Sequence, residues 1–338
     1  MASIKDVAKK AGVSISTVSY VISGTRPVSQ KTKDLVRRTM DEIGYRPHAV
    51  ARALASRRSR ILALVLSPQE RALGITELDL ITRASERAIE KGYHLVLWTV
   101  GDDQIRDLEE LIAQGLADGL ILMEIKENDA RVEWLRASGF PFAIIGRCSD
   151  SEEVSHTDID FRSTVREALA YLKELGHRRV ALVNQSRDVY LAGYGPVVRV
   201  HGDFEAACGD LGLDAFRLFA HPNPADGCRA MKTVLENLPD VTALLVMNDG
   251  AIPGILQAAS DEGKAIPDDL SIISLVSSSR FAEMMVPALT EMEVPVAELM
   301  GDAVDSLIAR LEGETGRANG RLWPCRLRIR KSTAVRRD

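Results

Sequence analysis

The sequence predicts a small all-α head, joined by a short hinge to a larger α/β core. The first 60 residues hold five Lys and eight Arg against three Asp and one Glu, a net charge of +9. The rest of the 338-residue chain sums to −14. That rest alternates short apolar runs with amphipathic helical segments, which is typical of parallel sheets covered by helices. A basic head on an acidic body indicates a nucleic-acid-binding protein.

The head begins with two short helices around a tight turn. Ser3 is a suitable N-cap, and Asp6 follows three residues later as in a capping box. Gly12 ends the first helix, because glycine accepts left-handed backbone, and Ser14 caps the second. The faces expected to be buried contain Ile4, Val7, Ala8 and Ala11 in the first helix, and Val18, Val21 and Ile22 in the second.

A third helix is expected to brace these two. It is capped at Ser29 and continues to Gly44. Its predicted buried residues are Leu35, Val36, Met40 and Ile43. The three helices together form a helix-turn-helix, in which the second helix exposes a face that fits the major groove.

Five residues on or near the second helix are candidate DNA contacts. Ser16 suits a base edge, Ile15 suits a thymine methyl group, and Tyr20 can give one hydrogen bond. Ser14 and Thr17 lie near the positive end of the helix dipole, where phosphates bind. We therefore expect the first three residues to read bases and the last two to hold the DNA backbone.

The stretch "YRPHAVARALASRRS" (45–59) predicts a short hinge helix after Pro47. A helix of two turns is marginal in water, so it would form only against DNA or a second copy. Val50 and Leu54 can then meet across a dyad, with Leu54 as a wedge in the minor groove. Three basic residues, Arg52, Arg57 and Arg58, are expected to contact phosphates. The alternative is a plain linker whose leucine packs on the core.

The remainder contains apolar runs typical of buried parallel strands. They are "ILALVL", "HLVLWTV", "DGLILM", "PFAIIG", "RVALVNQ", "TALLVM" and "SIISLV". About ten strands in a chain of this length favour two lobes over one sheet. The sequence therefore predicts two doubly wound parallel sheets.

The segments "IKDVAKKAGVSISTVSYVISG" and "VSQKTKDLVRRTMDEIGYRPHAVARALA" resemble the head and hinge helix of the LacI/GalR family. Further similar motifs, such as "KELGHRRVALV" and "VPALTEMEVP", span the body. The resemblance implies a head (1–46), a hinge (47–60) and a periplasmic-binding-protein-like core (61–338). Lobe 1 would comprise about 61–160 and 292–320, and lobe 2 about 161–291 and 321–338. The head is most similar to that of the purine repressor, which implies that Arg26 contacts a base.

The resemblance also implies effector-binding residues in a cleft between the lobes. Arg199 stands where the family uses an arginine fork for a ligand, with a surface salt bridge as the alternative. Asn248 and Asp249 follow the strand "ALLVM", where strand-end capping is the alternative role. Asp160 is a further candidate, and helix N-capping is its alternative.

Two departures from the family pattern concern the ligand. The family usually has Gly-(Phe/Tyr)-Asp-(Asp/Asn) after the strand "SII", but residues 274–277 are Ser-Leu-Val-Ser, so Val276 replaces the acceptor. Thr76 and Glu77 replace an aromatic pair. Both changes lie at expected ligand positions.

The sequence favours a regulator over an enzyme. It contains no G-x-S-x-G elbow, P-loop, H-E-x-x-H or complete G-x-G-x-x-G motif, so no catalytic residue and no cofactor are expected. No metal is expected either, because no further His or Cys completes a shell around His156, Asp158 and Asp160. Four distant cysteines, the absence of an apolar run of membrane length and the absence of a signal peptide predict a cytoplasmic protein.

The expected partners are double-stranded operator DNA, a sugar-like effector and a second copy of the chain, with no membrane. Two alternatives remain open. A solute-binding protein would use the same two-lobed body but would leave the basic head unexplained. A nucleoid protein that bends DNA would show little preference between DNA sites.

Overall fold

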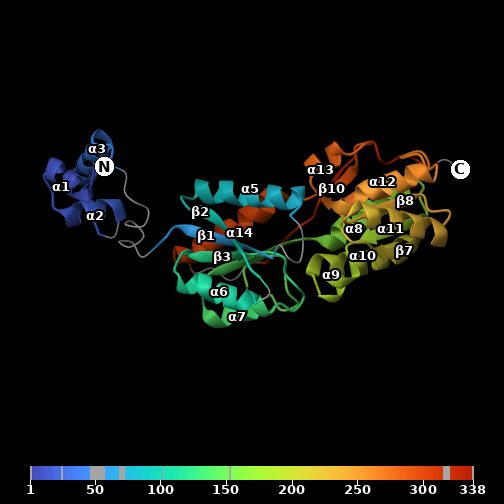
Figure 1. Cartoon of the computed structure of the whole chain (residues 1–338), viewed down its shortest axis with the longest axis horizontal. Helices are drawn as coiled ribbons and strands as arrows, with labels where there is room; N and C mark the ends of the chain where they lie inside the picture. The colour runs from blue at the N-terminus through green and yellow to red at the C-terminus, as the bar shows by residue number, and fades with distance from the viewer. Residues whose placement is uncertain are drawn as a thin grey trace.

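The computed structural model describes residues 2–23, 26–45, 58–67, 73–101, 103–151, 154–314 and 320–336. The chain forms a helical head followed by two α/β lobes (Figure 1). The predicted hinge helix, with Val50, Arg52, Leu54 and Arg57, lies outside the described residues. Among those described, no helix combines the length and the apolar character that crossing a bilayer requires.

The head consists of three helices with the predicted caps. Ser3 and Asp6 form a complete capping box, and Gly12 has a φ of 65°. The Ser14 hydroxyl accepts a hydrogen bond from the Thr17 amide at 3.0 Å. The helices are α1 (Ile4–Ala11), α2 (Ile15–Ser23) and α3 (Gln30–Glu42).

The head has its own small core, in which Val7, Val18 and Val36 are fully buried. The prediction for Leu35 was wrong, because this side chain is 41% exposed. Thr39 is buried instead, and its hydroxyl donates to the Leu35 carbonyl at 2.9 Å. The buried stripe of α3 follows positions 36, 39, 40 and 43, which is one residue away from Leu35 in helical phase.

The first lobe is built on a six-stranded sheet with the order β11-β5-β4-β3-β1-β2, and all its strand pairs are parallel. Helices α5 and α14 cover one face, and α6 and α7 cover the other (Figure 1). The strands are β1 (Ile61–Leu66), β2 (His94–Thr99), β3 (Gly119–Leu122), β4 (Phe142–Ile145), β5 (His156–Ile159) and β11 (Gly320–Trp323). The helices are α5 (Ile75–Glu90), α6 (Gln104–Ala113), α7 (Ala130–Ser138) and α14 (Val296–Leu311).

The second lobe has the sheet order β12-β10-β9-β8-β6-β7, and only β12 runs antiparallel among its described pairs. The pair α8 and α10 and the pair α11 and α12 pack on this sheet. Its strands are β6 (Arg179–Asn184), β7 (Asp214–Phe219), β8 (Ala243–Val246), β9 (Ser271–Ser277), β10 (Thr290–Glu293) and β12 (Arg326–Arg328). Its helices are α8 (Phe161–Glu174), α9 (Arg187–Leu191), α10 (Gly195–Leu211), α11 (Pro224–Asn237), the 3-10 turn η1 (Asp249–Ala251), α12 (Ile252–Asp261) and α13 (Ser279–Met284).

The chain crosses between the lobes three times: after β5, after β10 and between β11 and β12. At the last two crossings, the boundaries of the lobes differ by a few residues from those expected from the sequence. Strand β11 pairs with β5, so residues 320–323 complete the first sheet rather than the second. Strand β10 pairs with β9, so residues 290–293 belong to the second sheet.

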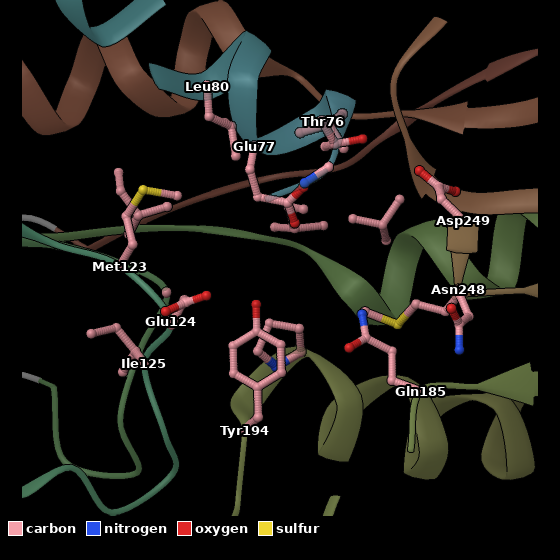
Figure 2. A pocket seen from close by; sticks show the side chains of 18 of the residues that line it. Thr76, Glu77, Leu80, Met123, Glu124, Ile125, Gln185, Tyr194, Asn248 and Asp249 are labelled. Carbon is pink, nitrogen blue, oxygen red and sulfur yellow. The ribbon is translucent and has the colours of Figure 1, made fainter. Parts of the chain in front are cut away.

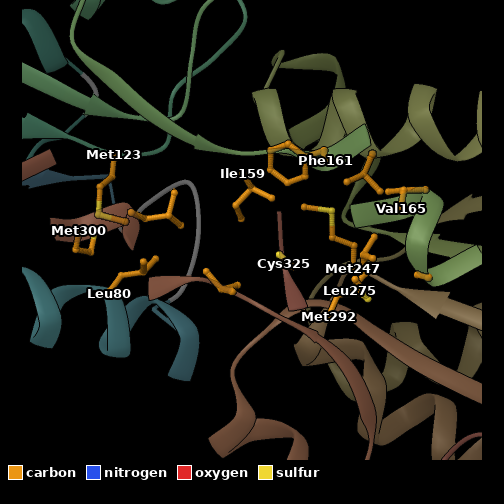
Figure 3. Close-up of a cluster of buried hydrophobic side chains, with 14 of the residues drawn as sticks. Leu80, Met123, Ile159, Phe161, Val165, Met247, Leu275, Met292, Met300 and Cys325 are labelled. Atoms are coloured by element: carbon orange, nitrogen blue, oxygen red, sulfur yellow. The ribbon is translucent and has the colours of Figure 1, made fainter. Parts of the chain in front are cut away.

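A continuous apolar cluster fills the space where the crossings meet (Figure 3). Ile159 and Phe161 come from the first crossing, Met292 from the second and Cys325 from the third. These side chains pack with residues of both lobes, such as Leu80 on α5 and Met247 after β8. The strand ends of the two lobes are therefore held close together.

Candidate functional site

A pocket with a volume of about 260 Å³ lies between the lobes, at the carboxyl ends of parallel strands from both sheets (Figure 2). Ligands of open α/β sheets bind at such strand ends. Its apolar lining includes Leu80, Met123, Ile159 and Phe161. Its polar lining consists of Thr76, Glu77, Glu124, Asp158, Gln185, Tyr194, Asn248 and Asp249.

Five of the predicted effector residues line this one cavity, namely Thr76, Glu77, Asn248, Asp249 and Val276. Thr76 and Glu77 lie in the first turn of α5, with their side chains toward the cavity (Figure 2). The Glu77 carboxylate accepts a hydrogen bond from the Gly74 amide at 3.0 Å. The buried Thr76 hydroxyl has no hydrogen-bond partner within the described part of the chain.

Asn248 and Asp249 follow β8 on the side of the second lobe (Figure 2). The Asn248 amide donates to the Ala220 carbonyl at 2.7 Å, while its buried oxygen has no partner among the described residues. Asp249 accepts hydrogen bonds at 3.1 Å from the hydroxyls of Ser274 and Ser277. These serines belong to the altered family motif, so the motif bonds a carboxylate from the turn that follows the neighbouring strand β8.

Val276 lies between the two serines and has a φ of 59°. A β-branched residue in this left-handed region is strained, and such strain is typical of ligand sites. The expected acceptor is thus absent at position 276, and Asp249 provides one nearby.

Arg199 and Asp160 lie outside the pocket lining. The Arg199 guanidinium is 11% exposed and forms ion pairs with Glu127 at 2.6 Å and Asp158 at 3.4 Å. The salt-bridge alternative therefore describes its contacts, although only the pair with Asp158 is buried on both sides. Asp160 is the N-cap of α8, and its carboxylate accepts from the Ser163 amide at 3.1 Å.

Four polar lining residues were not predicted from the sequence as effector contacts: Glu124, Asp158, Gln185 and Tyr194. Glu124 and Gln185 each come shortly after an apolar run, the same signal that identified Asn248. Asp158 was considered only as a metal ligand. The Tyr194 hydroxyl points into the cavity from the start of α10 (Figure 2), which no local motif indicated.

The carboxylate of Asp158 has a perturbed pKa. Burial raises its pKa to about 6, although Arg199 and Arg147 both act to lower it. Burial likewise lowers the pKa of Arg199, which Asp158 and Glu127 partly offset. Asp158 and Arg199 therefore each favour the charged form of the other.

The predicted base-reading residues lie on α2 and shortly after it. Ile15 is 46% exposed on α2, and Ser16 is exposed beside it. The Arg26 guanidinium lies 5.2 Å from the centre of the Tyr20 ring, a cation–π contact. Arg26 and Tyr20 are therefore neighbours, and Ile15 and Ser16 are accessible to solvent.

The predicted phosphate contacts divide into two groups. The Ser14 hydroxyl bonds the hydroxyls of Ser16 at 2.9 Å and Thr17 at 2.8 Å, so this group adjoins Ser16, one of the predicted base-reading residues. Arg58 instead donates to the Leu311 carbonyl at the end of α14, at 2.7 Å. In this structure Arg58 thus contacts the first lobe.

Comparison with known proteins agrees with this architecture. Residues 3–48 match the model for bacterial regulatory proteins of the lacI family, and residues 169–333 match a periplasmic binding protein-like domain. The regulator CelR of Thermobifida fusca is 32% identical over 91% of this chain and 92% of its own. The regulator AscG of Escherichia coli (strain K12) is 29% identical over 93% of each chain.

Solved structures agree as well. A CelR–cellobiose complex aligns with a TM-score of 0.72 and 26% identity, covering 98% of this chain and all of that one. A lac repressor dimer, bound to operator and an anti-inducer, aligns with a TM-score of 0.80 and 22% identity over 98% and 99% of the two chains, which shows the shared fold. The chain therefore belongs to the LacI/GalR family and is a DNA-binding transcriptional regulator with an effector-binding domain.

Proposed function

We propose that this regulator is a repressor that binds a palindromic operator as a homodimer, under the control of a sugar or sugar derivative. The pocket between the lobes is the observation on which the proposal depends, because it joins polar side chains of both lobes around one cavity. We infer that residues 1–46 bind DNA, that 47–60 form the hinge, and that the core senses the effector.

The chemistry of the pocket favours a ligand rich in hydroxyl groups. Four lining residues, Glu77, Glu124, Asp158 and Asp249, carry carboxylates that accept hydrogen bonds from hydroxyls. None of the described lining residues is Lys, Arg or His, which disfavours phosphates and carboxylic acids. The apolar lining suits the C–H faces of a sugar ring. The similar structure of a CelR regulator was solved in complex with cellobiose, which is such a ligand.

For DNA, we propose that Ile15, Ser16, Tyr20 and Arg26 read bases, Arg26 as in the purine repressor. Ser14 and Thr17 would hold phosphates beside them, because the Ser14 hydroxyl bonds those of Ser16 and Thr17. The hinge residues proposed to act on DNA are Arg52, Arg57 and Arg58 at phosphates and Leu54 in the minor groove. Such a protein would act in the cytoplasm, where bacterial DNA lies.

Exposed apolar side chains favour a second copy as a partner. Leu78 and Ile89 lie exposed on α5, and Leu97 on the edge strand β2 beside it. In the second lobe, Met284 and Val286 are exposed on and after α13, which packs against α5. These exposed apolar side chains lie on both lobes, and exposed apolar patches are typical of protein interfaces.

A thermal-shift screen tests the effector assignment, since a ligand that binds only the folded state raises its melting temperature. We expect neutral sugars such as cellobiose to include the active ligands, and sugar phosphates to be inactive. Asp249→Asn should abolish the shift, and Asp210→Asn, in an exposed ion pair on α10, is the control. A shift produced only by anionic ligands would contradict the proposal.

Gel shifts test the DNA assignment. With competitor DNA present, a repressor should prefer sites selected from a random library by orders of magnitude over non-specific DNA. The active ligand should then change the affinity for the selected site. Equal affinity for all sequences would instead indicate an architectural DNA-binding protein.

A further inference from the structure

The Arg199 guanidinium joins the two lobes. Arg199 lies on α10 of the second lobe, whereas all three of its partners lie in the first. One terminal nitrogen is 2.6 Å from the Glu127 carboxylate and donates to the Arg147 carbonyl at 2.7 Å. The other donates to the Asp158 carboxylate at 3.4 Å. Both terminal nitrogens of the guanidinium thus contact oxygens of the first lobe, so few of its N–H groups remain for a ligand.

The backbone makes a second connection at the same place. The Glu127 amide donates to the Gly193 carbonyl at 2.8 Å, and the Gly195 amide donates to the Ile125 carbonyl at 3.0 Å. A Cβ at Gly195 would collide with the Arg199 guanidinium and lie 3.2 Å from the Ile125 oxygen. Glycine at position 195 therefore permits the close approach of the lobes at this point.

Asp158 connects this contact to the pocket. Asp158 is only 4% exposed, and this small exposed part belongs to the lining of the cavity. One oxygen accepts from the Ile159 amide at 2.8 Å, and the other faces Arg199 and Arg147. Without these cations, burial would favour the neutral acid, which is a poorer acceptor for a ligand hydroxyl.

We propose that Arg199 is a positioning residue rather than a ligand fork: it clamps the second lobe to the first through Glu127 and Asp158, and it keeps Asp158 ionised as an acceptor at the pocket wall. The clamp stands on the inter-lobe contacts alone. The acceptor role rests on the proposed function, because it takes the pocket to be the effector site. A ligand that bonds Asp158 would then also bias the lobes toward closure, since the two effects share one side chain.

Amide hydrogen exchange of the full-length protein without ligand tests the clamp. The amides of Glu127 and Gly195 donate across the lobes, so their exchange reports lobe opening directly. We expect Arg199→Met to speed their exchange at least about tenfold, because it removes the cation that pairs with Glu127 and with the buried Asp158 across the lobes. Amides within β1 and β8 should keep their rates. Unchanged rates at positions 127 and 195 would overturn the clamp.

The matched control is Arg280→Met. Arg280 on α13 also forms an inter-lobe ion pair, 2.8 Å from Asp79 on α5, but its side chain is 71% exposed. Exposed pairs contribute little, so the exchange of the Glu127 and Gly195 amides should stay within about threefold of wild type. If Arg199→Met fails to fold, Glu127→Gln removes one arm of the clamp with less disturbance and should give the same direction of change.

Carboxyl NMR of Asp158 tests the second half of the proposal. In Arg199→Met the pKa of Asp158 should rise above about 6, whereas Arg280→Met should leave it in place. Arg199→Lys keeps the positive charge but not the guanidinium. It should therefore bring the pKa of Asp158 close to the wild-type value, while the amide exchange rates stay faster than in wild type. A pKa that is the same in all variants would overturn the positioning role. Both measurements omit ligand, so an error in the effector assignment cannot affect them.

Discussion

Asp158 is the residue at which pH is expected to act most directly. Its pKa of about 6 lies about two units above the value of an exposed aspartate, so the folded state holds the proton more tightly. The contribution of Asp158 to the free energy of unfolding should therefore fall by about 3 kcal/mol as pH rises from about 4 to about 6, and then stay constant. The charged groups around it are Arg147, Arg199 and His156.

Urea unfolding of wild type and Asp158→Asn between pH 4 and pH 7 measures this effect. Asparagine cannot titrate, so the difference between the two free energies of unfolding should change over this range. Parallel curves would show that Asp158 does not bind its proton more tightly in the folded state.

On the head, we expect Ser16 and Tyr20 to contribute to specificity. Replacing either by alanine should cost ~1–3 kcal/mol at a selected operator and little on random DNA, because base contacts are lost and phosphate contacts remain. Tyr20→Ala would also remove the stacking partner of Arg26. Quantitative gel shifts on both DNAs measure the costs, with Lys31→Ala on α3 as a control. Equal losses on both DNAs would show that these residues do not read bases.

At the scale of elements, the crossing of α11 and α12 depends on Gly254. A Cβ at this position would collide with the Pro224 carbonyl and lie 2.9 Å from the Cys228 amide nitrogen. Gly254→Ala should therefore force the two helices apart and destabilise the protein by roughly 1–3 kcal/mol. Since α12 follows the turn that begins at Asp249, ligand binding should weaken as well.

Gly202→Ala is the matched control for urea unfolding. Gly202 also lies inside a helix, α10, but a Cβ there meets no atom within 4 Å. The free energy of unfolding should therefore rise by about 0.5–1 kcal/mol, the helix preference of alanine over glycine. If both variants lost the same stability, the close crossing would not be the cause.

The hinge remains a prediction from sequence alone. Leu54→Ala should reduce the specific affinity and the bending of operator DNA together, because the wedge that unstacks the central base step is lost. Dimerisation through the core should be unaffected. Circular-permutation gel shifts measure the bend angle. Normal bending by the variant would favour the plain-linker alternative.

The helices of the head could be predicted because their signals are local. Caps at Ser3, Ser14 and Ser29 and the stop at Gly12 lie within a few residues of what they cap. Leu35 was misplaced because a shift of one residue on a helix turns a side chain by about 100°. Which of two adjacent residues is buried depends on the partner helices, and a local pattern does not contain that information.

At the scale of the whole molecule, dimerisation is expected to depend on the exposed apolar side chains of α5 and β2. Leu97→Glu places a charge on this exposed edge strand, so it should shift dimer to monomer without loss of fold. Sedimentation at micromolar concentration measures the state. Affinity for a palindromic site should fall with it, while binding of one half-site should stay constant, because the two heads no longer bind as a linked pair.

Leu191→Glu is the control for this change. Leu191 is also highly exposed, but it lies on α9, away from α5 and β2. Its variant should remain a dimer. Dissociation by both variants would indicate a general loss of stability rather than an interface.

The two lobes could be predicted from the alternation of apolar runs and helices, but the pairing of their last strands could not. Strand β11 pairs with β5 and β12 with β10 across more than thirty residues, and no local signal specifies such partners. The orientation of the Arg199 side chain could not be predicted for the same reason. Its sequence position suited a ligand fork, whereas Glu127 and Asp158 become its neighbours only when the lobes meet.

The three crossings also affect how the protein is made. While the ribosome is still translating, the first lobe lacks its outer strand, because β11 is supplied by residues 320–323. The second sheet is likewise incomplete until β12 and Ser332 have been synthesised. The Ser332 carbonyl accepts a hydrogen bond from the Ile272 amide, and its hydroxyl accepts one from the Thr290 amide. The head can fold early on the nascent chain, but neither lobe can finish ahead of the other. A stop codon after residue 314 would therefore leave two open sheet edges at once, and the truncated chain should aggregate or be degraded as a whole.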